Sequence, residues 1–248
     1  MNSTRRVNWA VVLALCNLSL LAQTNQTAVD QFRPFQVTIA ALSTKPLDKQ
    51  YEFLLKLSGG LMQEDYAAVT DQRDLPHFGH LAEELMRQKQ FGLMRELLRR
   101  REISPFNYYM LAELMAKEHD ADTFAILVTN SSPAKSPSTG KGSHIEKETG
   151  DGVPEYSALS LRHYLTDDPH GVRAQTHLIE LLEKNERTGV RAFAAQALGE
   201  ASGVDAIKAL EAATNDKGFV SSYQAGFVFV SQFAIEALKK VKKRESGK

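Results

Sequence analysis

Apolar and small residues recur at helical spacing in two segments near the end of the chain. Residues 190–199 read VRAFAAQALG, and residues 230–239 read VSQFAIEALK. The two segments share Val, Phe, two Ala and Leu at the same positions. Because a single helix of this kind cannot bury its apolar face alone, the repetition predicts helices that stack on one another. We therefore expect an all-α protein whose C-terminal half is an α-solenoid.

A helical pattern also runs through the first half of the chain. Apolar residues around Leu54 end at Gly59-Gly60, which is a favourable helix stop. The sequence LAEELM of residues 81–86 returns with one residue deleted as LAELM of residues 111–115, and a polar break and a second apolar helix follow each copy. This layout resembles the paired helices of tetratricopeptide-like repeats. Residues 23–129 are thus expected to form antiparallel helical hairpins, tetratricopeptide-like or irregular.

Residues 130–155 differ sharply in composition from the segments on either side. Residues 131–143 read SSPAKSPSTGKGS and have almost nothing to bury, so they cannot offset the entropy cost of becoming ordered. We expect a flexible linker or long loop here. It either divides two domains or bulges from one continuous solenoid, and the helical patterns on both sides favour the second alternative.

The region 156–248 contains the signs of a known repeat. Val190-Arg191 opens a helix, residues 194–200 read AAQALGE at its end, and residues 206–210 read AIKAL on the partner helix. From about residue 157 to residue 243 the chain resembles the HEAT-like repeats of the phycobilisome-lyase type. The resemblance implies paired helices, and it implies that an Arg after Val reaches an acidic residue of the adjacent repeat, which fits Arg191 and also Arg173.

Small residues explain how such helices pack. Alanines on one face let neighbouring helices approach closely, while Leu and Ile fill the seam between hairpins. Gly199 is expected to adopt the left-handed conformation that closes the first helix. Relatives with these repeats include chromophore lyases, in which the repeats hold a partner subunit, so the resemblance suggests a fold and a way of binding rather than an activity.

One insertion departs from the regular repeat. Residues 221–230 intervene before the second copy of the pattern, and they are rich in aromatic and β-branched residues. They could form a packed cap over the last hairpin, an extra helical turn, or an apolar loop that awaits a partner. Since aromatic residues dominate binding hot spots, Tyr223, Phe227 and Phe229 are the candidate partner-binding residues, together with Arg191.

The first 22 residues have the layout of a secretory signal peptide. Arg5 and Arg6 form a basic start, an apolar run follows from Trp9, and Ala22 can precede the cleaved bond. The expected location is therefore outside the cytoplasm, periplasmic or secreted, with an uncleaved membrane anchor as the alternative. Cys16 lies within this leader, so the mature chain is expected to lack disulfides and Cys-ligated zinc.

Charge and motifs exclude several classes of function. The chain has 30 Lys and Arg against 30 Asp and Glu, so it has no overall field that would attract nucleic acid or an anionic membrane. It has no phosphate-binding glycine loop, no Gly-x-Ser-x-Gly elbow and no His-Glu-x-x-His helix. His77 and His80 could chelate a metal on a helix, but a third ligand is not defined. His163, His170 and His177 are spaced seven residues apart and could share one face of a helix. Pro169 and Gly171 are expected to interrupt that helix, so a joint site of these histidines is not expected.

The sequence therefore predicts an exported helical-repeat scaffold that binds another protein, with no catalytic, cofactor or metal residues of its own. Two rivals stay open. One is an enzyme, or a lyase- or chaperone-like protein, that uses the repeats to hold its partner. The other is a scaffold anchored to a membrane by an uncleaved leader.

Overall fold

The computed structural model describes residues 39, 44–60, 78–132, 152–166, 169–222 and 226–246. These residues are mostly helical, and a two-stranded β-hairpin is the exception. The prediction of a mainly helical protein is confirmed for these residues. The leader, residues 1–22, lies outside the described residues.

The helices of the first half are α3 (Leu47–Gly60), α5 (Phe78–Arg87), α6 (Phe91–Arg100), α7 (Pro105–Ala116) and α8 (Ala121–Ser131). The second half contains α10 (Val153–Ser160), the 3-10 turn η1 (Leu161–Tyr164), α11 (His170–Lys184), α12 (Thr188–Leu198), α13 (Val204–Ala213), β1 (Phe219–Ser222), β2 (Gly226–Phe229) and α14 (Val230–Ser246). The predicted linker lies mostly outside the described residues, and its two ends are helical because α8 includes Asn130 and α10 starts at Val153.

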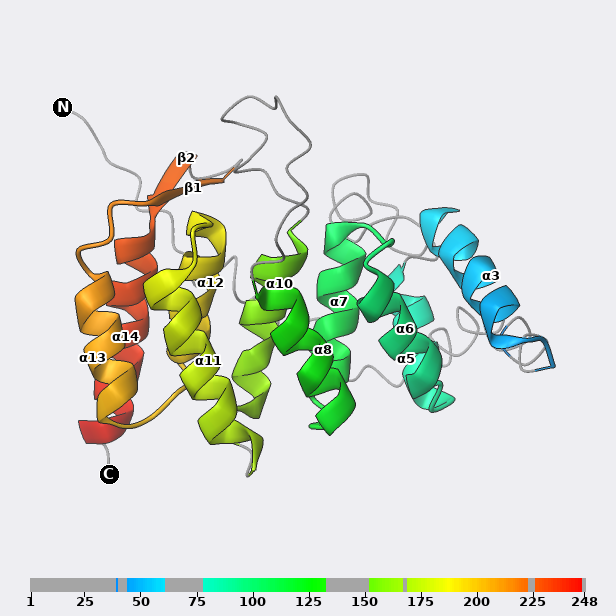
Figure 1. Cartoon of the computed structure of the whole chain (residues 1–248), viewed down its shortest axis with the longest axis horizontal. Helices are drawn as coiled ribbons and strands as arrows, with labels where there is room; N and C mark the ends of the chain where they lie inside the picture. Colours follow the sequence, from blue (N-terminus) through cyan, green and yellow to red (C-terminus); the bar gives the residue numbers. More distant parts are fainter. Residues whose placement is uncertain are drawn as a thin grey trace, which may run out of the picture.

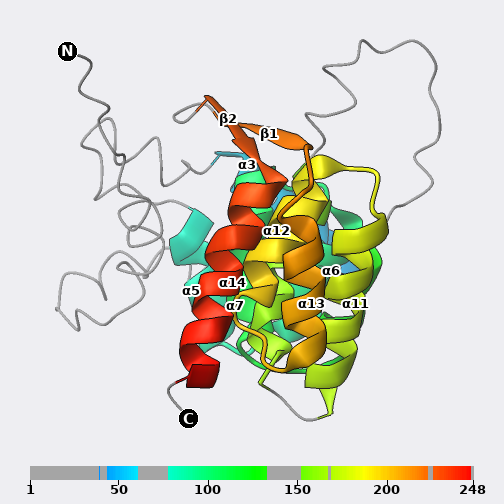
Figure 2. The same cartoon turned by 90° about the vertical axis from the view of Figure 1, so that its left-hand side faces the viewer.

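The helices lie in two rows that alternate along the sequence (Figures 1 and 2). Row A consists of α5, α7, α10, α12 and α14, and each of these helices contacts the next. Row B consists of α6, α8, α11 and α13, which also contact one another in this order. The chain thus passes back and forth between the rows, and the core lies between them. The contacts of α10 with α7 and α8 join the two halves of the chain into one stack.

Local signals explain the sharp reversals between the rows. Ser104 precedes Pro105 and accepts a hydrogen bond of 3.2 Å from the backbone N–H of Asn107, which caps α7. Asp120 caps α8 in the same way through the N–H of Thr123. Arg101 takes a left-handed conformation with φ of 58° and ends α6. These caps keep the loops short, so sequential helices run antiparallel.

Small side chains allow the close packing of row A. Ala194 and Ala197 of α12 are fully buried, and Ala234 and Ala237 occupy the equivalent positions of α14. The expected left-handed conformation of Gly199 is wrong, because its φ and ψ are −57° and −18°. A Cβ at this position would lie 3.3 Å from the Cα of Ala237. The same Cβ would lie 2.9 Å from the carbonyl oxygen of Gln196, so both the end of α12 and the close passage of α14 leave room only for a glycine.

The insertion before α14 forms the β-hairpin. Its register pairs Phe219 with Phe229 and Val220 with Val228. Val228 is buried and Val220 packs against the core, so this face of the hairpin covers the ends of α12 and α14. Within residues 221–229, the positions that the structure describes are strand, so the insertion is neither an extra helical turn nor an irregular loop there. The aromatic and β-branched composition that set this segment apart is typical of strands.

Overpacking at a buried alanine of row A should therefore destabilise the protein. We expect Ala194→Leu to lower the free energy of unfolding by about 1–3 kcal/mol, because the added atoms must enter the filled contact of α12 with its neighbours. Ala212→Leu is the matched control, since Ala212 is exposed on α13 and should change stability by less than about 0.5 kcal/mol. Urea denaturation measures both variants, and equal losses would contradict this packing.

Candidate functional site

The residues predicted to contact a partner lie around the β-hairpin. Phe229 is 44% exposed and stands opposite Phe219, which is 39% exposed. The two phenylalanines occupy the face opposite to the packed valines, because side chains alternate along a strand. Tyr223 lies outside the described residues. The backbone of Phe227 pairs with Ser221, and its side chain lies outside the described part of the chain.

Arg191 contacts the segment that leads into the hairpin, and its guanidinium is bound within the protein. Its Nε donates to Asp216 Oδ2 at 2.7 Å, and its NH1 group donates to the carbonyl of Asn185 at 2.8 Å. Asp216 Oδ1 accepts the backbone N–H of Gly218 at 2.7 Å, and the carbonyl of Gly218 accepts the N–H of Val230 at 2.8 Å. Arg191 therefore fixes the base of the hairpin, and a direct contact with a partner stays a prediction.

The repeat resemblance implies that the Arg after Val reaches an acidic residue, and Arg191 and Arg173 can be compared with this expectation. Arg191 meets Asp216, an acidic residue three positions after the end of α13, which is the partner helix of the same repeat and not the adjacent repeat. Arg173 behaves differently, because its guanidinium lies 5.1 Å from the ring centroid of Phe124. The first arginine is thus an ion-pair residue and the second a cation–π residue.

A row of aromatic rings crosses four helices of row A. The ring centroids of Tyr109 on α7 and Tyr156 on α10 lie 5.0 Å apart. Tyr156 lies 5.8 Å from Phe193 on α12, which lies 6.3 Å from Phe233 on α14. All four side chains are partly exposed. The repeated pattern of the sequence includes Phe193 and Phe233, but it did not predict the aromatic row. A signal was present, because Tyr156 follows Val153 by three residues, as each Phe follows its Val.

A groove of about 720 Å³ lies beside the aromatic row. Its charged lining comes from Arg162 and His163 after α10, Glu200 after α12, and Lys240 and Arg244 on α14. Gln196 and Glu200 follow Phe193 by three and seven residues, so helical spacing places the groove and the rings on the same side of row A. Arg244 forms an ion pair of 2.7 Å with Glu200 and also donates to the carbonyl of Ala201 at 2.9 Å.

Two residues of the lining, Arg162 and His163, belong to a polar cluster around the buried Glu113. Glu113 accepts hydrogen bonds from Ser160 at 2.8 Å and from Arg162 at 2.5 Å, and His163 Nε2 lies 3.0 Å from Glu113 Oε2. Burial alone would raise the pKa of Glu113, but the hydrogen bond from His163 and the charge of Arg162 outweigh it and lower the pKa. Ser160 and His163 both bind the carboxylate and do not bind each other, so this is not the pairing of a nucleophile with a base.

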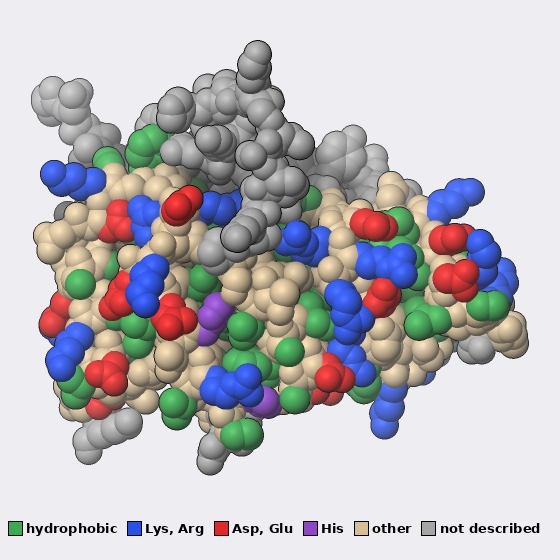
Figure 3. Space-filling view, viewed as in Figure 1, with side chains coloured by type: hydrophobic (Ala, Val, Ile, Leu, Met, Phe, Trp, Pro, Cys, Tyr) green, Lys and Arg blue, Asp and Glu red, His purple; other side chains and the backbone are tan. Residues whose placement is uncertain are grey.

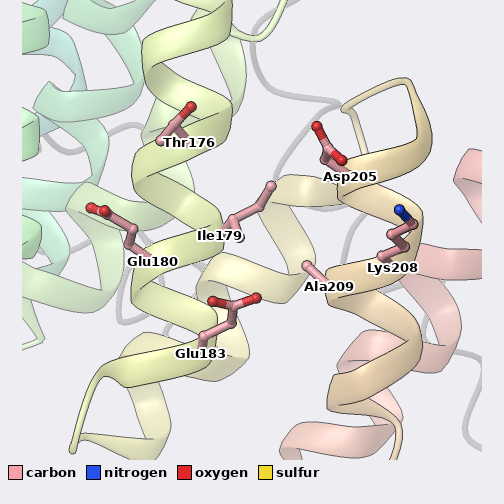
Figure 4. A pocket seen from close by; sticks show the side chains of 7 residues that line it. All are labelled: Thr176, Ile179, Glu180, Glu183, Asp205, Lys208 and Ala209. Atoms are coloured by element: carbon pink, nitrogen blue, oxygen red, sulfur yellow. The ribbon is translucent and has the colours of Figure 1, made fainter.

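A second hollow, of about 410 Å³, lies between α11 and α13 (Figure 4). Its floor contains Ile179 and Ala209, and the exposed carboxylates of Glu180, Glu183 and Asp205 surround it. None of these carboxylates has an ion-pair partner within the described ranges. Lys208 adds one positive charge to the lining against these three carboxylates, so the hollow is acidic on balance, whereas the groove of row A carries more cations than exposed carboxylates.

The histidines serve separate packing contacts. His163 belongs to the Glu113 cluster, His170 stacks on Phe124 at 4.8 Å, and His177 Nε2 lies 2.9 Å from Ser131 Oγ. Burial lowers the pKa of His80, and His77 lies outside the described residues. Within the described ranges no three His, Cys, Asp or Glu residues gather as metal ligands would.

The face drawn in Figure 3 carries Lys, Arg, Asp and Glu side chains in a mixed pattern without a large region of one sign. No helix in the described part of the chain combines the length and the apolar character that a membrane span needs. Comparisons of the chain with protein-family models, with curated proteins and with solved structures find no match.

The Arg191–Asp216 pair makes a pH-dependent prediction. The hydrogen bond from Arg191 is the main cause that lowers the pKa of Asp216 below its ordinary value of 3.8. A carboxylate with a lowered folded-state pKa stabilises the fold above its unfolded pKa, and this contribution is lost as the pH falls through the folded pKa. Arg191→Met should therefore cost about 1–3 kcal/mol near neutral pH, because it leaves the half-buried carboxylate unpaired. This cost should shrink below pH 3.8.

Lys239→Met is the matched control for that experiment. Lys239 pairs with Glu236 at 2.9 Å, but both side chains are largely exposed, so its loss should cost less than about 0.5 kcal/mol. Urea denaturation from acid to neutral pH measures both variants. A cost of Arg191→Met that does not vary with pH would show that the ion pair contributes nothing.

Proposed function

We propose that this chain is an exported helical-repeat scaffold, an α-solenoid of antiparallel hairpins, that binds another protein and catalyses no reaction itself. The alternation of the chain between rows A and B supports a repeat architecture. Each internal helix of a row contacts a neighbour on both sides, as stacked hairpins do. Such a stack presents long surfaces on which a partner can lie.

The observation that carries the proposal is the exposed phenylalanine pair of the β-hairpin. Phe219 and Phe229 are exposed side by side, whereas Val220 and Val228 already pack the hairpin onto the helices. Exposed neighbouring aromatic residues on a rigid support are typical of protein-binding surfaces. The Arg191–Asp216–Gly218 contacts supply the rigidity.

The hairpin variant Phe229→Ser should weaken partner binding about tenfold or more, because a central aromatic contact would be lost. A photo-reactive residue placed at Phe219 first identifies the partner by mass spectrometry, and binding of that partner is then measured with purified proteins. Val172→Ser is the matched control, since Val172 is 79% exposed on α11 of row B and should leave the affinity unchanged. Equal affinities of the wild-type protein and Phe229→Ser would contradict a role for the hairpin.

Export makes a separate prediction about the N-terminus. If the leader is removed after Ala22, the mature protein begins at Gln23 and stays in the soluble exported fraction. Intact-mass spectrometry of the protein from its native host measures this directly. A mass that includes residues 1–22, in a membrane fraction, would instead support a membrane-anchored scaffold.

A further inference from the structure

We propose that the aromatic row and the groove of row A together bind an acidic peptide segment with apolar residues along one side. This inference rests on the proposed scaffold function and names the chemistry of the partner. The apolar side of the peptide would lie on Tyr156, Phe193 and Phe233. Its carboxylates would lie in the groove, near Lys240 and Arg244.

The aromatic row and the groove lie a fixed distance apart along the helices of row A. Phe233 and Lys240 on α14 are seven residues apart, which corresponds to two helical turns and about 10 Å along the axis, and Glu200 follows Phe193 by the same number of residues in the turn after α12. The rings and the groove therefore run as two parallel bands across the same helices. This separation matches the width of one peptide segment with an apolar and a polar side.

The charge of the groove is positive on balance. Lys240 and Arg244 contribute two positive charges to its lining, whereas the charge of Arg162 is balanced by its ion pair with Glu113. Glu113 is buried and is already bound by Arg162, so Glu200 is the carboxylate that the groove exposes. Lys240 lies 3.8 Å from Glu200 and is half exposed, so its ammonium group can turn to an incoming carboxylate. An acidic segment complements this surface, whereas a basic segment would meet like charges.

Single-stranded nucleic acid also binds rows of aromatic and basic residues. Bases need accessible ring faces for stacking. Here Tyr156 meets Phe193 edge-on at an interplanar angle of 88°, and Phe193 stacks on Phe233 at 27°, so the rings use much of their surface on each other. Glu200 within the groove would also repel phosphates. A peptide therefore fits the observations better.

A random-peptide display library selected on the full chain tests the proposal. We expect enriched peptides that combine Asp or Glu with aromatic or aliphatic residues. The affinity of one labelled enriched peptide is then measured for three variants. Phe233→Ala and Lys240→Glu should each weaken binding about tenfold or more, since one removes a ring and the other reverses a charge in the groove. Lys239→Glu is the matched control and should leave the affinity unchanged, because Lys239 does not line the groove.

The variants are compared only after their thermal unfolding shows that they are folded. Selection of no peptides, or of neutral or basic ones, would overturn the proposal, as would equal binding by all three variants. Displacement of the peptide by a thymidine oligonucleotide would assign the surface to single-stranded nucleic acid instead. A partner that is cross-linked at Phe219 but binds Phe233→Ala and Lys240→Glu normally would leave the scaffold function in place and contradict this inference alone.

Discussion

The close approach of α10, α12 and α14 depends on small side chains at the positions where these helices meet. Val153 and Val230 open α10 and α14, and Val190 is the third residue of α12. The residues four and seven positions after each Val are all small and buried: Ser157 and Ser160, Ala194 and Ala197, and Ala234 and Ala237. Because nothing larger separates the backbones, the rings three positions after each Val can pack directly on their neighbours. The close approach of these helices places the aromatic rings in a row. It also sets the position of the groove and the position at which the hairpin packs on α12 and α14.

In α10, serines stand at the two positions where α12 and α14 have alanines. These serines explain the buried polar groups between the two halves of the chain. A buried hydroxyl must form a hydrogen bond, so each serine requires a partner on α7. Ser157 shares a hydrogen bond of 2.7 Å with the hydroxyl of Tyr108, which also accepts a hydrogen bond of 2.9 Å from Asn130 of α8. Ser160 donates to Glu113. The polar cluster therefore fixes how the first half of the chain meets the second, and this structural role accounts for its histidine and its carboxylate.

Much of the fold could be predicted from residues that act locally. The repeated Val, Phe, Ala and Leu positions locate α12 and α14, and the Gly59-Gly60 stop locates the end of α3. The backbone conformation of Gly199 does not follow from the sequence, because the requirement for a glycine comes partly from α14, which packs against it. The aromatic row and the groove depend on residues from four helices, so their proximity is a property of the stack and not of any motif. The hairpin had a signal, its strand-like composition, but the surrounding helical pattern obscured it.

The central claim is that row A and the hairpin form the surface that a partner protein covers. Hydrogen exchange of the free protein and of its partner complex tests this claim most directly, because it maps the covered backbone without mutation. The account predicts added protection in β1, β2 and the exposed side of α10, α12 and α14, with row B unchanged. Added protection confined to α6, α8, α11 and α13 would contradict it.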